Sequence, residues 1–167
     1  DAATARVNPV VTLLPSGQVL LTGGSNAAGS TSYASAELYP TMPAATVTPA
    51  SALPAARYEH TDTLLSDGDV LVTGGFGGSD EPLASSLRYR PATGQWTAAA
   101  SLPQATNGHS ATLLPSGQVL VLGGQGTLQQ ALLYTPAANA WRATTAIPQG
   151  RRLHSATLLP GGQVLLA

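Results

Sequence analysis

The three histidines are the most obvious candidates for chemistry, because imidazole is both a metal ligand and a general base near neutral pH. His60, His109 and His154 each stand six residues after the proline of a Leu-Pro or Ile-Pro pair. This constant spacing places them at the same position of a repeated unit. Because equivalent positions of neighbouring units diverge instead of converging on one ion, we favour a structural interpretation. In it, the ring nitrogens satisfy backbone groups between units.

Two arginines and one phenylalanine are the next candidates. Arg57 and Arg151 stand three residues before a histidine, where each could pair with a neighbouring carboxylate or bind an acidic ligand. Phe76 is the only phenylalanine and follows a Gly-Gly pair. We favour a place in the core over a binding platform for this ring.

Composition excludes several classes of protein. The chain has 167 residues, of which 43% are hydrophobic and only 9% charged, with a formal net charge of −1. This balance predicts no nucleic-acid partner. The absence of cysteine excludes disulfides and thiolate metal sites. An apolar run of about 18 residues, as a membrane helix requires, is also absent. The sequence contains no nucleophile elbow, zinc-peptidase motif or phosphate-binding loop, so we expect no catalytic residue, cofactor, metal or membrane partner.

A repeat organises the whole chain. The segment Val-Thr-Leu-Leu-Pro-Ser-Gly-Gln-Val-Leu-Leu-Thr-Gly-Gly at 11–24 recurs, with changes, at 62–75, 111–124 and 156–167. The valines at 19, 70, 119 and 164 mark its register, at successive spacings of 51, 49 and 45 residues. A second recurring unit places tyrosine and tryptophan seven residues apart, at Tyr89 and Trp96 and at Tyr134 and Trp141. Repeats of this period indicate stacked or radially arranged supersecondary units.

Each period predicts four short antiparallel strands, named A to D in chain order. A glycine corner such as Pro-Ser-Gly joins A to B. Strand C ends at Tyr39, Tyr89 or Tyr134, and strand D carries the tryptophan. Gly94 and Asn139 stand in the C–D corner, where a positive φ is needed. The Gly-Gly pair ends strand B, and we expect it to let the backbone pass close to the tyrosine and tryptophan of the same unit.

A four-stranded unit with a Gly-Gly pair, a tyrosine and a tryptophan resembles the Kelch repeat, which forms the blades of β-propellers. The spacing of Arg57 and His60 also resembles an Arg-x-x-His pattern of such repeats. The first unit departs from the pattern, with Val47 in place of the tryptophan, Pro9 in place of the histidine, and a C–D corner at 40–46 that is one residue longer. The resemblance implies an all-β fold of four-stranded antiparallel blades.

The expected organisation is one domain over 1–167, with three complete blades and the A–B hairpin of a fourth. The blade boundaries are about 7–51, 58–100, 107–146 and 152–167. Because such a partial propeller leaves a blade flank and a strand edge uncovered, we expect a homo-oligomer or the remainder of a longer propeller chain to cover them.

The candidate binding surface is the face formed by the B–C and D–A connections, because variable loops on a rigid scaffold carry binding residues. The B–C connections are 25–33, 76–82 and 125–128, and the D–A connections are 55–60, 104–109 and 149–154. The candidate residues on this face are Arg57, Glu59, His60, Phe76, Asp80, Glu81, Asn107, His109, Arg151, Arg152 and His154.

We therefore expect a non-catalytic scaffold that binds a protein or a carbohydrate. The alternative is part of a carbohydrate-active propeller enzyme. Kelch propellers include oxidases related to galactose oxidase, whose cofactor requires a cysteine that this chain lacks. They also include sialic acid epimerases, which use charged loop residues and for which Arg57, Glu59 and His60 are available. Arginine without lysine, together with the resemblance to secreted bacterial Kelch arrays, favours an extracytoplasmic location.

Overall fold

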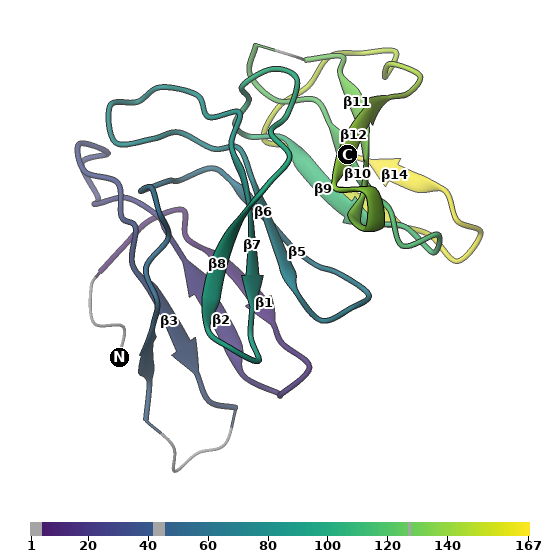
Figure 1. The fold of residues 1–167 in the computed structure, drawn as a ribbon. Coiled ribbons are helices and arrows are strands. Elements are labelled where there is room, and N and C mark those ends of the chain that lie inside the picture. The colour runs from purple at the N-terminus through teal and green to yellow at the C-terminus, as the bar shows by residue number, and fades with distance from the viewer. Residues whose placement is uncertain (1–4, 42–45, 127) are drawn as a thin grey trace.

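The fold consists of antiparallel sheets that follow one another along the chain (Figure 1). A computed structural model describes residues 5–41, 46–126 and 128–167, so the expected corner 40–46 and loop 125–128 each fall partly outside the described residues. The described part contains three four-stranded sheets and one two-stranded sheet, each with its strands in chain order. The expected all-β class is confirmed, and the four sheets do not close into a ring in the described part of the chain. No helix long and apolar enough to cross a bilayer occurs there.

The strand bounds follow the repeat. The first sheet contains β1 (Val10–Leu13), β2 (Val19–Thr22), β3 (Ala36–Tyr39) and β4 (Thr48–Ala50). The second contains β5 (Thr61–Leu64), β6 (Val70–Thr73), β7 (Ser86–Arg90) and β8 (Gln95–Ala99). The third contains β9 (Ser110–Leu113), β10 (Val119–Leu122), β11 (Ala131–Thr135), a 3₁₀ turn (Pro136–Ala138) and β12 (Ala140–Ala143). The fourth contains β13 (Ala156–Leu158) and β14 (Val164–Leu166).

Glycine and asparagine form the corners as the sequence predicts. In the β5–β6 corner, Gly68 has a φ of 87° and donates its N–H to the carbonyl oxygen of Leu65, and the other three hairpins repeat this turn. Gly94 and Asn139, in the corners before β8 and β12, have φ values of 67° and 46°. Only these residue types adopt the left-handed region at low cost.

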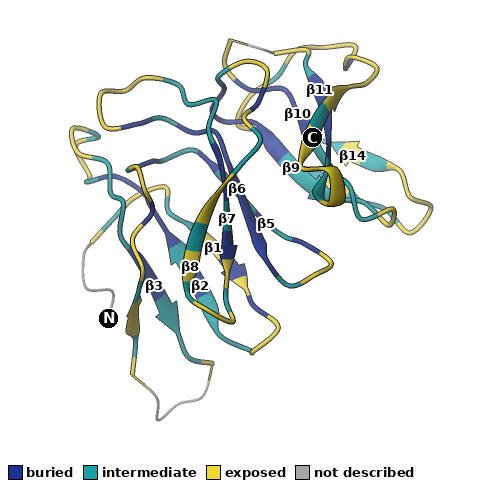
Figure 2. Cartoon of the chain, in the orientation of Figure 1, coloured by how far each residue is buried: buried dark blue, intermediate teal, exposed yellow. Residues whose placement is uncertain are grey.

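The hydrophobic core lies between successive sheets, so each sheet depends on its neighbours (Figure 2). Tyr89 pairs with Trp96 across β7 and β8, with ring centroids 4.8 Å apart, and Tyr134 and Trp141 repeat the arrangement at 4.9 Å. Each indole N–H then donates to the preceding sheet's last segment: Trp96 to Ser51 at 2.8 Å and Trp141 to Ala100 at 2.7 Å. The two tryptophans therefore pack against the tyrosine of their own sheet and bond to the sheet before it.

The Gly-Gly pairs serve a different contact from the one expected. A Cβ on Gly74 would overlap the carbonyl oxygen of Thr106 and would lie 2.8 Å from Cε1 of His109, both from the next unit. Gly75 donates its N–H to that same Thr106 carbonyl at 2.9 Å. The pairs 23–24 and 123–124 make the same contacts with the units that follow them. The expectation that these glycines accommodate the tyrosine and tryptophan of their own unit is wrong. A Cβ on the first glycine of each pair would meet the following unit, and a Cβ on the second would meet the connection that precedes the first strand of its own unit.

Candidate functional site

The predicted loop-face residues fall into three groups. Arg57, His60, Asn107 and His109 are buried; Glu59, Phe76, Arg151 and His154 are half-buried; Asp80, Glu81 and Arg152 are exposed. The first strands of successive sheets lie side by side, β1 by β5, β5 by β9 and β9 by β13. The connections between sheets therefore gather beside these strands, and the β2–β3, β6–β7 and β10–β11 loops lie farther along the same face (Figure 1).

The histidines join neighbouring sheets. Nε2 of His60 lies 2.9 Å from Oγ1 of Thr22, and Nε2 of His109 lies 3.1 Å from Oγ1 of Thr73, each in the preceding sheet. His154 reaches Ser110 in the same way at 2.9 Å. The three rings therefore lie between units, as the structural interpretation expects, but their partners are side-chain hydroxyls and not the expected backbone groups. Burial lowers the pKa of His60 to about 3 and that of His109 to about 4, so both rings are neutral at pH 7.

Arg57 is a structural cation within its own unit. Its side chain is buried, and it donates from Nη1 to the carbonyl oxygen of Gly74 at 2.9 Å and from Nη2 to Oγ of Ser85 at 3.1 Å. Burial lowers its pKa to about 10. Arg6 makes the equivalent bonds in the first unit, to the carbonyl oxygens of Gly23 and Ser35. Each guanidinium group therefore links the connection before a sheet to the loop between the second and third strands of that sheet.

The other predicted arginines and Asn107 do not meet at one point. Arg152 donates to Oε1 of Gln125 at 2.9 Å on the exposed surface, and Nε of Arg151 is buried with no hydrogen-bond partner among the described residues. Asn107 is fully buried, and its side-chain amide likewise has no partner there.

An aromatic pair lies on the second unit's part of the loop face. The rings of Tyr58 and Phe76 are 5.2 Å apart between centroids and inclined by 30°. The hydroxyl of Tyr58 donates to Oδ1 of Asp80 at 2.8 Å, in a solvent-exposed bond. Burial, together with the hydrogen bond to Asp80 and the charges of Asp80 and Glu59, raises the pKa of Tyr58 to about 12. Phe76 is half-buried and belongs to none of the core clusters of the described residues, so the expected core position is wrong.

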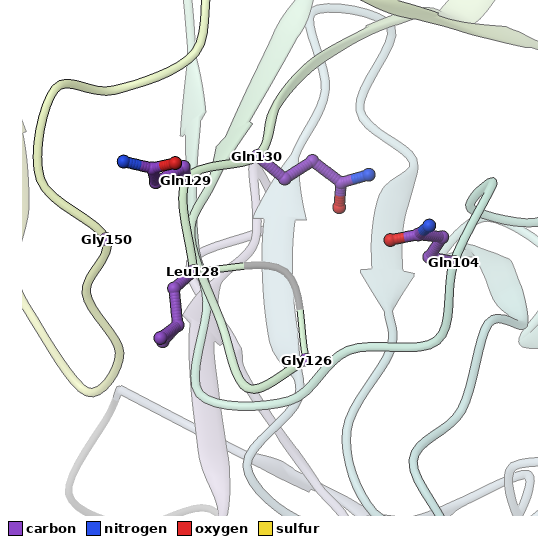
Figure 3. Close-up of a pocket in the computed structure, with 6 residues that line it drawn as sticks. All are labelled: Gln104, Gly126, Leu128, Gln129, Gln130 and Gly150. Carbon is purple, nitrogen blue, oxygen red and sulfur yellow. The ribbon is translucent and has the colours of Figure 1, made fainter.

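A cavity that lies farther along this face is lined by amides. It has a volume of about 620 Å³. Its described lining comes from three loops: Gln104 before β9, residues Gly126, Leu128, Gln129 and Gln130 before β11, and Gly150 before β13. In Figure 3 the amides of Gln104 and Gln130 point toward one another across the cavity, while Gln129 turns toward Gly150. We call this the glutamine pocket.

Sequence reasoning missed both the glutamine pocket and Tyr58. The glutamines are uncharged and belong to no chemical motif. Gln104, after Pro103, recurs as Gln149 after Pro148, whereas Gln129 and Gln130 do not recur in the other units. The available signal is partial: Gln104 falls in the D–A connection 104–109 assigned to the loop face, whereas Gln129 and Gln130 lie just beyond the assigned B–C connection 125–128. Tyr58 stands where the first unit has Val7 and the third has Asn107, so the signal is an aromatic residue in one unit alone.

A smaller cavity of about 260 Å³ lies beside the first strands, bordered by the three histidines and by Asn8, Glu59 and Leu153. Asn8, Glu59 and Leu153 immediately precede Pro9, His60 and His154 in the sequence. Their backbone φ values are 51°, 52° and 53°. Within the described ranges, no group of three or more histidine and carboxylate side chains is arranged to hold a metal ion.

The described residues of this face offer amides, an aromatic pair and carboxylates on separate loops. Comparison with known proteins adds no function to this geometry: no protein-family model matches the chain, and neither does any curated protein.

Proposed function

We propose that this chain is part of a Kelch-type β-propeller that acts as a non-catalytic binding scaffold, with its ligand on the loop face. The support is the recurrence of one four-stranded unit, whose Gly-Gly, histidine and Tyr–Trp positions make the same contacts in successive units. These contacts connect successive units, whereas the loops of the face differ in length and composition.

The glutamine pocket is the observation that carries the ligand assignment. A side-chain amide offers both a donor and an acceptor, and Oε1 of Gln130 is buried with no partner among the described residues. None of the described lining residues is charged, and Leu128, which is 46% exposed, adds an apolar surface. Hydroxyl groups on an apolar ring match this combination of donors, acceptors and apolar carbon. The ligand class that fits best is a neutral glycan.

A carbohydrate-active enzyme is the weaker alternative. It would use Arg57, Glu59 and His60. However, Arg57 already hydrogen-bonds to Gly74 and Ser85, and His60 to Thr22, within the protein. Glycan binding without turnover of acidic sugars by the purified chain is the result that separates scaffold from enzyme.

We expect Gln104→Ala and Gln130→Ala each to weaken binding of a captured neutral glycan at least about tenfold, because each removes a hydrogen-bonding amide from the cavity wall. A glycan array selects the ligand, and titration calorimetry then measures the affinity of each variant. The matched control is Gln149→Ala, an exposed glutamine one residue before Gly150 that does not line the cavity. Equal losses in all three variants, or none, would contradict the assignment.

The outer faces of the first and last sheets support the propeller arrangement. Leu13 of β1 is 61% exposed, although its equivalents Leu64 and Leu113 pack against the preceding sheet. Leu165 of β14 is 55% exposed, whereas its equivalent Leu71 is fully buried. The internal interfaces show what covers such faces, namely the facing side of another sheet of the same kind. We therefore propose that a second copy of the chain packs against them.

Light scattering tests this association. We expect the chain to form a dimer at micromolar concentration and Leu13→Asp to shift it toward the monomer, because the charge would be buried at the contact. Leu128→Asp, on the loop face, is the matched control and should leave the mass unchanged. A stable 16.8 kDa monomer of the unmodified chain would disprove the second-copy proposal and leave further sheets of the same polypeptide as the cover.

A further inference from the structure

The second unit carries a group of aromatic and acidic side chains that no other unit repeats. Its members are Tyr58, Glu59, Phe76, Asp80 and Glu81, and we call it the acidic aromatic patch. It lies on the loop face but shares no residue with the glutamine pocket.

The backbone of this region does not require the aromatic rings. Tyr58 and Phe76 form an isolated antiparallel bridge, with N–H to carbonyl distances of 3.1 and 2.8 Å. Val7 and Ser25 form the same bridge in the first unit, at 2.8 and 2.9 Å. A valine and a serine form the same backbone bridge in the first unit. The fold therefore does not require the aromatic rings of Tyr58 and Phe76.

The carboxylates of the described chain that form no ion pair stand in the same two connections as these rings, 55–60 and 76–82. Glu37, Asp67 and Asp69 form ion pairs with arginines, and Asp62 is fully buried beside His60. The remaining described carboxylates are those of Glu59, Asp80 and Glu81, and none of the three forms an ion pair there. Asp80 holds the Tyr58 hydroxyl at 2.8 Å, and Glu59 is the next residue along the chain from Tyr58. The nearest arginine in sequence, Arg57, is buried and bonded inward.

Two of these acidic residues have a left-handed backbone conformation, which glycine adopts at lower cost. Asp80 has a φ of 55° in a turn closed by its N–H to the carbonyl oxygen of Gly77, and the equivalent turn of the first unit has Gly29, with a φ of 71°. Glu59 has a φ of 52°, where the third unit has Gly108, with a φ of 61°. A side chain at a left-handed position costs folding free energy that glycine avoids. At both positions the second unit therefore has an acidic residue where another unit has glycine.

We propose that the acidic aromatic patch binds an organic cation, an ammonium or guanidinium group that lies against the Tyr58 and Phe76 rings within reach of the carboxylates. Aromatic faces attract such cations through the ring quadrupole, and nearby carboxylates add a charge attraction that salt weakens. This deepens the proposed function, since it rests on the loop face being a binding surface. The two ligand sites use different residues and different probes, so either can fail alone.

The test is titration of the full chain with choline and with its neutral isostere, 3,3-dimethylbutan-1-ol, followed by the ring proton resonances of Tyr58 and Phe76. We expect saturable binding of choline, at least about fivefold weaker binding of the neutral isostere, and weakening of the choline complex by added salt. An arginine-containing peptide titrated in parallel identifies the source of the cation: tighter binding than choline indicates a basic partner protein, and weaker binding a small ammonium ligand. Equal binding of choline and its neutral isostere, or no saturation by any of the cations, would overturn the proposal.

Two variants taken from the chain's own units locate the site. Phe76→Ser, as in the first unit, should weaken choline binding about tenfold. Asp80→Gly, as at Gly29, should weaken it about fivefold while the thermal midpoint stays the same or rises. Leu153→Gly is the matched control, because it relieves the same left-handed backbone strain (φ 53°) without removing a carboxylate. It should leave choline binding unchanged. Retained choline binding by both Phe76→Ser and Asp80→Gly would place the cation elsewhere and overturn the assignment.

Discussion

Replacing Gly74 with alanine is expected to destabilise the protein by about 3–5 kcal/mol, from the cost of a side chain at a left-handed position and of overlap with fixed backbone. Gly74 has a φ of 57°, and a Cβ there would overlap the carbonyl oxygen of Thr106 and approach the His109 ring. Neither neighbour can move freely, because that carbonyl accepts the N–H of Gly75 and the ring bonds to Thr73. Urea unfolding monitored by tryptophan fluorescence measures the loss.

Gly78→Ala is the matched control for this variant. Gly78 lies in the loop after the same strand, β6, and the nearest atom to its added Cβ would be Oγ of Ser32, at an ordinary contact distance of 3.8 Å. We expect a change within about 0.5 kcal/mol. If Gly74→Ala unfolded at the same urea concentration as Gly78→Ala, the contact between the second and third units would not be the constraint that fixes this glycine.

The strands and corners of this fold could be predicted because they depend on neighbours close in sequence. A short apolar run and a glycine at a fixed corner define each hairpin, and four copies of the pattern set the register. The partner of the Gly-Gly pair could not be predicted in this way. Thr106 and His109 lie more than 30 residues beyond Gly74, and only the packing of one sheet on the next brings them together.

The candidate site residues likewise divide into those whose placement the sequence could predict and those whose partners it could not. Asp80, Glu81 and Arg152 are exposed on the predicted face, as hydrophilic residues of variable loops should be. Arg57 was chosen as a possible ligand for acidic groups, but its position lets it satisfy the carbonyl oxygen of Gly74 inside its own unit. Charge alone does not distinguish an arginine that binds a ligand from one that binds the backbone. The difference lies in which unsatisfied carbonyl groups the fold places nearby.

Asp62 shows how one unit can depart from the repeat in its interior. The equivalent residues are Val11, Ala111 and Ala156, so the fold does not need a carboxylate here. Oγ1 of Thr22 donates to Oδ2 of Asp62 at 2.7 Å, which uses its only hydrogen. The 2.9 Å contact between Thr22 and Nε2 of His60 is therefore a bond donated by the imidazole. Nε2 of the neutral His60 ring lies 3.4 Å from Oδ1 of Asp62, which has no hydrogen-bond partner among the described residues.

We expect Asp62→Asn to stabilise the protein at high pH and to have little effect at low pH. Burial raises the pKa of Asp62 from 3.8 to about 7, opposed by the hydrogen bond from Thr22 and the charge of Arg57. A raised pKa means that the folded state holds the proton more tightly, so this contribution to stability is full below pH 4 and is lost as the pH rises through about 7. The burial penalty on the ionised group at pH 8 is on the order of 4 kcal/mol. Asparagine keeps an acceptor for Thr22 and carries no charge.

The measurement is the difference in unfolding free energy between Asp62→Asn and the unmodified chain at pH 4.5 and at pH 8. His60 and His109 have lowered pKa values and therefore destabilise the folded state as the pH falls below about 6.5, but they do so in both proteins and cancel in the difference. Asp62→Ala, which copies Ala111, separates loss of charge from loss of the hydrogen bond. Asp80→Asn, at an exposed carboxylate, is the control and should show no such dependence. A difference for Asp62→Asn that stays constant between the two pH values would show that the buried carboxyl group does not titrate in this range.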